Sequence, residues 1–344
     1  MRSPALRVPR SDGEATRQKL VAAGRLRSDL RIVLEGEHLL LPILPPIAPE
    51  IPGDRIEAEF PEGPAGAAPT QYRELVELSE AERAFLPRSF DVIGDIVLIR
   101  VPDELASRSA AIGEALLRFV PNARIVGADH GVHGPDRVRR LERIAGAGSW
   151  STRHRENGIE IDVDVERAYF SPRLAREHAR VASSVRDGEE VFDLCCGVGP
   201  FALAIARDGR ARTVWAVDHN PAAIELLVAS AARLGRGDRL RPVRADVASF
   251  LAEGRPCDRA VLNLPHEGIK YLASVARSVR PAGAIHYYEV VDRTALATRG
   301  IGLVRNLEPD GGWRVAEQHA VHPYSSDSDL VAFELHREPA RGPT

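Results

Sequence analysis

The residues from Val191 to Phe201, with the sequence VFDLCCGVGPF, have the types and spacing of a nucleoside-binding turn. An apolar strand leads through Asp193 into a turn with Gly197 and Gly199, and an apolar helix follows. Glycines at such a turn let a ligand approach the backbone, because a Cβ atom would clash with it. A second apolar strand ends in Asp218, where an acid can accept hydrogen bonds from both ribose hydroxyls of an adenosine.

This turn differs from the dinucleotide-binding pattern of three glycines, G-x-G-x-x-G, because residue 202 is Ala. A shorter glycine turn suits a ligand that has no pyrophosphate to bind, and S-adenosylmethionine (AdoMet) is such a ligand. Taken alone, the two glycines are equally consistent with a turn that needs them only for its backbone geometry. The rest of the unit therefore has to decide between these interpretations.

Two more polar residues follow apolar strands in the expected order. Asp246 follows the third expected strand and can accept a hydrogen bond from the exocyclic amine of an adenine. Asn263 follows the fourth and begins the triplet Asn-Leu-Pro, an arrangement that amino-methylating AdoMet enzymes use to hold a planar N–H of their target. Asn263 could instead be a turn residue before Pro265. Its position after the other site residues favours the functional interpretation.

Composition narrows the possible classes of protein. The chain has 344 residues and a formal net charge of −3. It has three cysteines, two of which are adjacent, and this number and spacing predict neither a disulfide framework nor a zinc site. No apolar run is long enough for a membrane span, and the N-terminus lacks the apolar segment of a signal peptide. We therefore expect a cytoplasmic protein without a metal or a membrane partner, and the sequence leaves its oligomeric state open.

The expected elements predict an α/β protein with several domains. Residues 1–52 read as a small α+β domain, and residues 53–86 as a linker rich in Pro and Gly. Residues 87–158 read as a middle α+β domain. Residues 159–344, which carry the glycine turn, read as the nucleoside-binding domain, with a disordered tail from Arg337.

A cationic cluster lies near the end of the expected middle domain. Residues 132–155 contain six arginines against two acids. The arginines are Arg137, Arg139, Arg140, Arg143, Arg153 and Arg155. The cluster could be the solvated face of a long hairpin, or it could contact phosphates. Because the chain as a whole is acidic, a nucleic-acid partner would depend on such a local patch.

Several motifs together resemble the archaeal and eukaryotic tRNA (guanine-37-N1)-methyltransferase family over nearly the whole chain. These motifs are LRVPRSDGEATRQKL, DVIGDIVLIRVPDEL, RENGIEIDVDVERAYFSPRLAREHARV, DLCCGVGPF, VDHNPAAIELL, NLPHEG and IHYYEVV. The resemblance implies a small N-terminal domain that checks tRNA shape, a middle domain, and a C-terminal Rossmann-like class I AdoMet methyltransferase domain. It also implies that tRNA is the partner, bound through the arginine cluster and the N-terminal domain.

By this resemblance Glu177 matches the general base of the family, Arg137 its catalytic arginine and Asn263 its site asparagine. The chemistry is consistent, because guanine N1 carries a proton that a carboxylate can remove, and a guanidinium stabilises the charge that develops on O6. The glycine turn and the resemblance together predict the cofactor-binding residues Arg173, Asp193, Gly197, Gly199, Asp218, Asn220, Asp246 and Asn263. One departure from the family is the stretch VGADHGVHGPDR before Arg137, which is acidic and contains histidines where the family is lysine-rich.

Three other functions remain open at this stage. The acidic composition favours a small-molecule or nucleoside acceptor for the same N-methylating chemistry. The related wybutosine-pathway enzymes transfer the aminocarboxypropyl group of AdoMet to a tRNA base, although the intact Asn-Leu-Pro triplet argues against that reaction. A non-catalytic module that binds RNA or AdoMet is the third possibility, and the presence of Arg137, Glu177 and Asn263 together argues against it.

Overall fold

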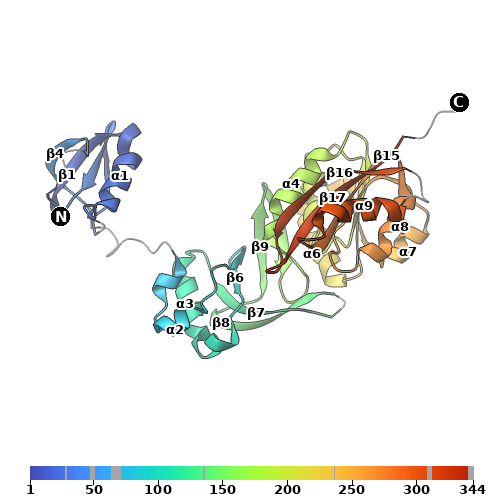
Figure 1. Cartoon of the computed structure of the whole chain (residues 1–344), viewed down its shortest axis with the longest axis horizontal. Coiled ribbons are helices and arrows are strands. Elements are labelled where there is room, and N and C mark those ends of the chain that lie inside the picture. Colours follow the sequence, from blue (N-terminus) through green and yellow to red (C-terminus); the bar gives the residue numbers. More distant parts are fainter. Residues whose placement is uncertain are drawn as a thin grey trace. The chain divides into compact units, whose positions relative to one another are not determined.

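The computed structural model describes residues 1–27, 29–46, 51–62, 71–134, 136–235, 237–307 and 312–339. The chain forms two compact units, Met1–Leu75 and Val76–Thr344 (Figure 1). Residues 63–70 of the stretch that was expected to be a linker, and residues 340–344 of the expected disordered tail, lie outside the described residues.

The first unit is a four-stranded antiparallel sheet with the strand order β2-β3-β1-β4 and one helix. Its elements are β1 (Arg2–Pro9), α1 (Gly13–Ala22), β2 (Val33–Glu35), β3 (His38–Pro42) and β4 (Asp54–Glu59). Leu20 of α1 packs against Leu6 and Leu41 of the sheet, and all three are fully buried. This apolar contact holds the helix on the sheet.

The prediction that a linker begins at residue 53 is wrong. Residues 54–59 are strand β4, which pairs with β1 from Arg2 opposite Glu59 to Arg7 opposite Asp54. Glu62 forms a further bridge with Leu30. The alternation of apolar and charged residues, such as Ile56 and Glu57, is typical of a strand. The nearby Pro and Gly residues led to the prediction of a linker instead.

The second unit begins with a four-stranded sheet in the order β5-β6-β7-β8. Its elements are α2 (Glu80–Arg83), β5 (Asp91–Ile93), β6 (Ile96–Ile99), α3 (Ser109–Phe119), β7 (Ile125–His133) and β8 (Val138–Gly146). Strands β7 and β8 form a long hairpin that extends toward the rest of the unit (Figure 1). The separate hairpin β9 (Ser151–Glu156) and β10 (Ile159–Asp164) follows.

The expected boundary at residue 158 falls in the turn between β9 and β10, so it does not separate two cores. One continuous apolar cluster contains Ile96 and Trp150 from the segment before this boundary, and Ile161, Val191 and Leu227 from the segment after it. The β9–β10 hairpin therefore joins the two segments through shared packing.

A seven-stranded sheet forms the centre of the second unit, with the order β13-β12-β11-β14-β15-β17-β16. Its strands are β11 (Glu190–Leu194), β12 (Thr213–Asp218), β13 (Leu240–Arg244), β14 (Cys257–Leu262), β15 (Val279–Asp292), β16 (Trp313–Pro323) and β17 (Ser328–Arg337). The five strands from β13 to β15 in this order are parallel to one another. Strand β17 pairs antiparallel with β15, and β16 pairs antiparallel with β17. The expected Rossmann-like architecture is therefore confirmed.

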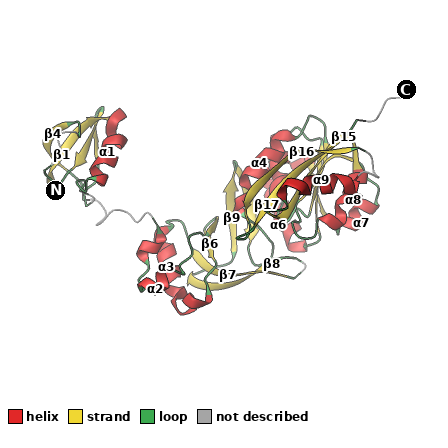
Figure 2. Cartoon of the chain, in the orientation of Figure 1, coloured by secondary structure: helices red, strands yellow, loops and turns green. Residues whose placement is uncertain are grey.

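Helices cover both faces of this sheet (Figure 2). They are α4 (Ala175–Ser184), α5 (Pro200–Asp208), α6 (Pro221–Arg233), α7 (Val247–Ala252), α8 (Ile269–Ser278) and α9 (Leu296–Leu307). The first three pack in one apolar cluster and the last three in another. Within the described part of the chain, no helix combines the length and apolar character that crossing a membrane requires.

The chain direction reverses beside the central strand β11. It proceeds outward from β11 through β12 to β13, and then returns to place β14 on the other side of β11. In open α/β sheets a crevice forms outside the carboxyl ends of the strands at such a switch point. Ligands are therefore expected at the ends of β11, β12 and β14.

A buried ion pair offers a test of how this unit is held together. Arg259 Nε donates to Glu189 Oε2 over 2.8 Å, and both side chains are less than 10% exposed. Replacing Glu189 with Gln leaves a buried cation without its counter-charge, so we expect the free energy of unfolding to fall by about 3–5 kcal/mol. Urea unfolding followed by tryptophan fluorescence measures this, because Trp150, Trp215 and Trp313 all lie in the second unit.

The matched control is Glu253→Gln, which breaks an exposed pair with Arg255 and should change stability by about 1 kcal/mol or less. If Glu189→Gln is no more destabilising than this control, the buried pair does not stabilise the fold as argued.

Candidate active site

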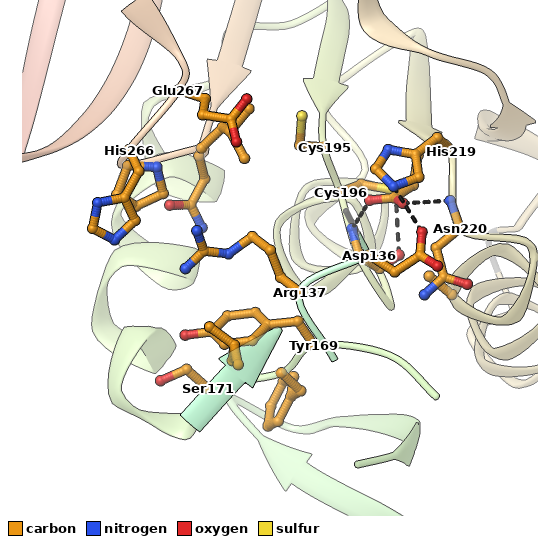
Figure 3. A pocket seen from close by; sticks show the side chains of 18 of the residues that line it. Asp136, Arg137, Tyr169, Ser171, Cys195, Cys196, His219, Asn220, His266 and Glu267 are labelled. Carbon is orange, nitrogen blue, oxygen red and sulfur yellow. Dashed lines mark hydrogen bonds and ion pairs between the residues drawn. The ribbon is translucent and has the colours of Figure 1, made fainter. Parts of the chain in front are cut away.

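A cavity of about 660 Å³ opens at the predicted crevice (Figure 3). The loops after β11, β12, β13 and β14 contribute Cys195–Gly197, Asp218–Asn220, Asp246 and Asn263–Glu267 to its wall. The tip of the β7–β8 hairpin contributes Asp136 and Arg137, and the segment before α4 contributes Tyr169, Phe170 and Ser171. The topology therefore brings together residues that are separated by more than a hundred positions in the sequence.

The glycine turn uses its two glycines in different ways. Gly197 lines the cavity and has a φ of 56°, and Gly199 has a φ of 79° at the start of α5. A Cβ on Gly199 would lie 2.3 Å from Leu227 Cδ1, so this glycine permits close packing of the turn against α6. Of the two predicted ligand contacts, only Gly197 is among the cavity-lining residues that the structure describes.

Asp193 lies beneath the turn and is not among those lining residues. It is fully buried, and its Oδ2 accepts a hydrogen bond from the backbone N–H of Ala202 over 3.0 Å. Burial raises the pKa of Asp193 to about 8, although the Ala202 N–H acts in the opposite direction. Asp193 therefore supports the turn from the interior.

Asp218 links the glycine turn to the next loop. Its Oδ2 accepts from the Gly197 N–H over 2.8 Å, and its Oδ1 accepts from the Asn220 N–H over 2.9 Å. Asn220 in turn caps α6 by accepting from the Ala222 N–H over 2.9 Å. An ionised carboxylate has about four lone-pair positions, so Asp218 can still accept hydrogen bonds from a ribose diol in the cavity.

Asp246 lies on the same side of the cavity. Its Oδ1 caps α7 by accepting from the Ala248 N–H over 2.8 Å, and the Tyr271 hydroxyl lies 3.4 Å from its Oδ2. Val247 and Ala223 add apolar surface to this part of the wall. A planar base with an exocyclic amine fits between such an acceptor and such a surface.

The opposite side of the cavity contains Asn263 and Arg137. Asn263 Oδ1 is buried and has no hydrogen-bond partner among the described residues, so its capacity to accept a hydrogen bond is unused in this structure. The guanidinium of Arg137 lies 5.8 Å from the centre of the Tyr169 ring, within the range of a cation–π contact (Figure 3). Its charge also helps to lower the pKa of His266, an effect that is due mainly to the burial of His266.

Glu177 occupies the first turn of α4 and is 5% exposed. Its carboxylate accepts from Arg180 over 2.9 Å, from the Tyr288 hydroxyl over 2.9 Å, and lies 2.8 Å from His319 Nε2. Burial by itself would raise the pKa of Glu177, but the hydrogen bonds from Arg180 and His319 outweigh burial and hold it below its ordinary value. Glu177 is not among the described residues that line the cavity, although its neighbour His178 is.

Arg173 also lies outside the described cavity lining. Its Nε donates to Asp91 Oδ1 over 2.8 Å, and its side chain is nearly half exposed. The predicted contact between Arg173 and the cofactor therefore stays a prediction.

The arginine cluster does not form one uniform cationic strip. Arg153 and Arg155 on β9 pair with Glu160 on β10. Arg139 pairs with Asp129 within the β7–β8 hairpin. Arg143 lies over the ring of Trp150. The count of charges in the sequence therefore overstates the positive charge that these residues present.

The polar residues that line the cavity fit AdoMet. Asp218 and Asp246 offer acceptors for a ribose and an adenine, and Gly197 leaves the backbone open beside them. The orphaned Asn263 Oδ1 lies on the other side, where an acceptor of the methyl group would enter. Within the described ranges, no group of three or more His, Cys, Asp or Glu side chains is arranged to hold a metal ion.

Comparisons with known proteins agree with this geometry. Family models match residues 152–310 (TRM5/TYW2 methyltransferase domain), 72–149 (TYW2 N-terminal domain) and 5–51 (tRNA methyltransferase 5 N-terminal domain). The chain is 36% identical over 285 residues to the tRNA (guanine(37)-N(1))-methyltransferase Trm5b of Pyrococcus abyssi, a match that covers 83% of each chain. The chain belongs to the TRM5/TYW2 methyltransferase family. The family resemblance of the sequence is thereby confirmed.

Solved structures place the chain in the same family. The crystal structure of Trm5b from Pyrococcus abyssi matches 98% of this chain and 99% of that one, with a TM-score of 0.76 and 32% identity. The complex of aTrm5 with tRNALeu matches 97% and 99%, with a TM-score of 0.74 and 29% identity. As a member of this family the protein is an AdoMet-dependent methyltransferase.

Several lining residues of this TRM5/TYW2 family member were not predicted as site residues from its sequence. They are Asp136, Tyr169, Ser171, His178, His219, His266, Lys270, Tyr271, His322 and Tyr324. Tyr169 and His219 lie within the motifs quoted above, and His219 is adjacent to the predicted site residues Asp218 and Asn220. Their position in the sequence could therefore have indicated that they line the site. His322 and Tyr324 lie at the end of β16, and only the antiparallel addition of β16 and β17 brings them to the cavity.

Asp218 provides a direct test of the cofactor site. If Asp218 binds the ribose as predicted, its replacement with Ala removes those contacts and the bond to the Gly197 N–H, so we expect the affinity for S-adenosylhomocysteine to fall by about 100-fold. Isothermal titration calorimetry measures the dissociation constant, and circular dichroism checks folding. Asp208→Ala, at an exposed acid near the end of α5, should bind normally. Unchanged binding by the Asp218 variant would rule out its assignment.

Proposed function

We propose that this protein transfers the methyl group of AdoMet to N1 of guanosine 37 in tRNA. The observation that carries this proposal is that Arg137 and Asn263, whose Oδ1 has no hydrogen-bond partner among the described residues, line the same cavity as Asp218 and Asp246. This pair offers one cationic donor and one acceptor, which match the O6 and the N–H groups of a guanine. The relatives named as guanine-37-N1 methyltransferases support the same acceptor.

Each residue has a role in the proposed reaction. Guanine N1 becomes a nucleophile only when its proton leaves, and Glu177 accepts that proton. Arg137 stabilises the negative charge that develops on O6, and Asn263 Oδ1 accepts a hydrogen bond from the base and holds it in line. Bound AdoMet supplies a methyl group activated by its sulfonium, so that the N–C bond forms as the S–C bond breaks and S-adenosylhomocysteine leaves.

The environment of Glu177 supports its proposed role in one respect and constrains it in another. The donors around the carboxylate keep it ionised, so it is ready to take a proton at neutral pH. The same donors occupy both oxygens of Glu177, so one of these donors has to move away before the N1–H of the guanine can bind there. His319 is the donor best suited to do so, because its side chain is about a third exposed, whereas Tyr288 is fully buried.

Transfer RNA is the proposed partner, supported by the similarity to aTrm5 in complex with tRNALeu over 97% of this chain. The first unit, which matches the tRNA methyltransferase 5 N-terminal domain, is proposed to check tRNA shape. The exposed part of the arginine cluster is proposed to contact phosphates.

A second candidate reaction is the transfer of the aminocarboxypropyl group of AdoMet to a tRNA base. The match of residues 72–149 to the TYW2 N-terminal domain favours it, because TYW2 relatives share this fold. The Asn263-Leu264-Pro265 triplet favours methyl transfer instead.

The acceptor can be identified directly. We expect the protein, incubated with labelled AdoMet and matched tRNA transcripts carrying G37 or A37, to produce 1-methylguanosine from the G37 transcript alone. Mass spectrometry of the digested tRNA identifies the nucleoside. An aminocarboxypropyl mass would establish the second reaction instead. Modification of neither transcript, with S-adenosylhomocysteine still bound, would contradict both and point to a small-molecule acceptor.

Glu177→Gln tests the base assignment. It removes the proton acceptor but keeps the shape of the side chain, so we expect the single-turnover rate to fall by roughly 100- to 10,000-fold with little change in S-adenosylhomocysteine affinity. Glu253→Gln, at an exposed acid on the same unit, is the control and should react at the normal rate. A normal rate for Glu177→Gln would exclude the base assignment.

The pH profile of Arg180→Gln separates a base from a structural acid. Because this change removes a main cause of the low pKa of Glu177, burial then dominates and the pKa rises. The carboxylate is protonated below its pKa, so the acid limb of the single-turnover rate should move to higher pH in the variant. An acid limb that stays in place while the rate changes would mean that Glu177 does not titrate as the base.

A further inference from the structure

The tip of the β7–β8 hairpin carries two neighbouring charged side chains that point in opposite directions. Asp136 points toward His219 and Asn220 on the cofactor side of the cavity, whereas the Arg137 guanidinium extends toward the acceptor side, near Tyr169 and His266 (Figure 3). The two residues are adjacent in the chain, so the position of one constrains the other.

The tip is a tight turn with little packing of its own. The Arg137 N–H donates to the Gly134 carbonyl over 3.2 Å, and Gly134 and Arg137 both have positive φ angles, of 69° and 50°. A Cβ added to Gly131 or Gly134 would meet no atom within 4 Å. Among the described residues of the tip, Gly131 and Gly134 therefore have open space beside them, and the contact of Asp136 helps to fix the position of the tip.

The base of the hairpin is fixed separately. Arg139 pairs with Asp129 across the hairpin and donates to the Phe170 carbonyl over 3.1 Å, which attaches the strands to the segment before α4. These contacts lie below the turn. They leave the direction of the Arg137 side chain to the contacts of the tip itself and to the ring of Tyr169, over which the guanidinium lies.

The contact of Asp136 is with the cofactor loop. Its Oδ1 lies 2.8 Å from His219 Nε2. His219 stands between Asp218 and Asn220, and Asp218 fixes this loop by accepting from the Gly197 and Asn220 N–H groups. This contact therefore ties the tip of the hairpin to the loop that carries the proposed ribose ligand.

We propose that Asp136 is a positioning residue that acts through His219 to hold Arg137 in its place on the acceptor side, and so couples the cofactor loop to the catalytic arginine. The role of Arg137 in this coupling rests on the proposed function. Neither Asp136 nor His219 contacts the reacting atoms. A cofactor that orders the loop after β12 thereby also orders the hairpin tip, and Arg137 is in position when the acceptor base enters.

The size of the effect follows from the exposure of the pair. The side chains of His219 and Asp136 are 47% and 42% exposed, so the contact contributes as a partly solvated ion pair does. Loss of such a pair changes an equilibrium by about fivefold at most. We therefore expect a loss of turnover of about three- to fivefold, not the collapse that removal of a catalytic group produces.

A double-mutant cycle tests the coupling. Asp136→Asn and His219→Gln should each lower the single-turnover rate on the G37 transcript by about three- to fivefold at low salt, and the double variant should be no slower than either single variant. His219→Lys places a hydrogen-bond donor beside Asp136 again and should restore most of the rate. Glu142→Gln, which breaks the His130–Glu142 pair on the same hairpin, is the matched control and should react normally.

Hydrogen exchange provides a readout that does not depend on turnover. In the wild type, S-adenosylhomocysteine should protect the backbone amides of residues 131–138, and this protection should be lost in Asp136→Asn while the loop after β12 stays protected. Wild-type rates and unchanged protection in Asp136→Asn, or single effects that multiply in the double variant, would overturn the proposal. If the wild type methylates no tRNA, the proposed function fails, and the exchange experiment still decides the coupling.

Discussion

The hydrogen bond from the Gly197 N–H to the Asp218 carboxylate is the contact on which the site depends. It joins the turn after β11 to the end of β12 over 2.8 Å, at the point where the strand order reverses. The bond requires a backbone with positive φ at Gly197 and an acid at the end of the neighbouring strand. With both in place, one carboxylate shapes the turn, fixes the Asn220 loop and keeps lone pairs for a ribose.

The acceptor side combines the loop after one parallel strand with elements that come from outside the parallel strands. The β7–β8 hairpin supplies Arg137, the loop after β14 supplies Asn263, and the antiparallel pair β16–β17 supplies His322. Because these elements share one continuous core with the central sheet, they are held against it by packing. The cavity therefore combines a cofactor half set by the sheet with an acceptor half set mainly by its additions.

The site residues predicted from the sequence divide into those that line the cavity, on both of its halves, and those that do not. Asp218, Asn220, Asp246 and Gly197 follow apolar strands at short distances in the chain, so local pattern and strand order suffice to bring them together. Glu177 and Arg173 were assigned by resemblance, and their contacts are those of buried or surface ion pairs outside the described lining of the cavity. A motif identifies such a residue but does not say which neighbours occupy its hydrogen-bonding groups.

Strand β4 and the domain boundary show the same limit at the level of the fold. The linker composition around Asp54–Glu59 is a local signal, whereas the pairing of these residues with β1 is a contact across about fifty residues. By itself, the sequence determined the strand–turn–helix unit around the glycine turn, the acids at the ends of β12 and β13, and the family. Tertiary structure alone decided that Asp136 meets His219 and that β16 closes the cavity, because such contacts depend on the packing of distant elements and not on any local period of the chain.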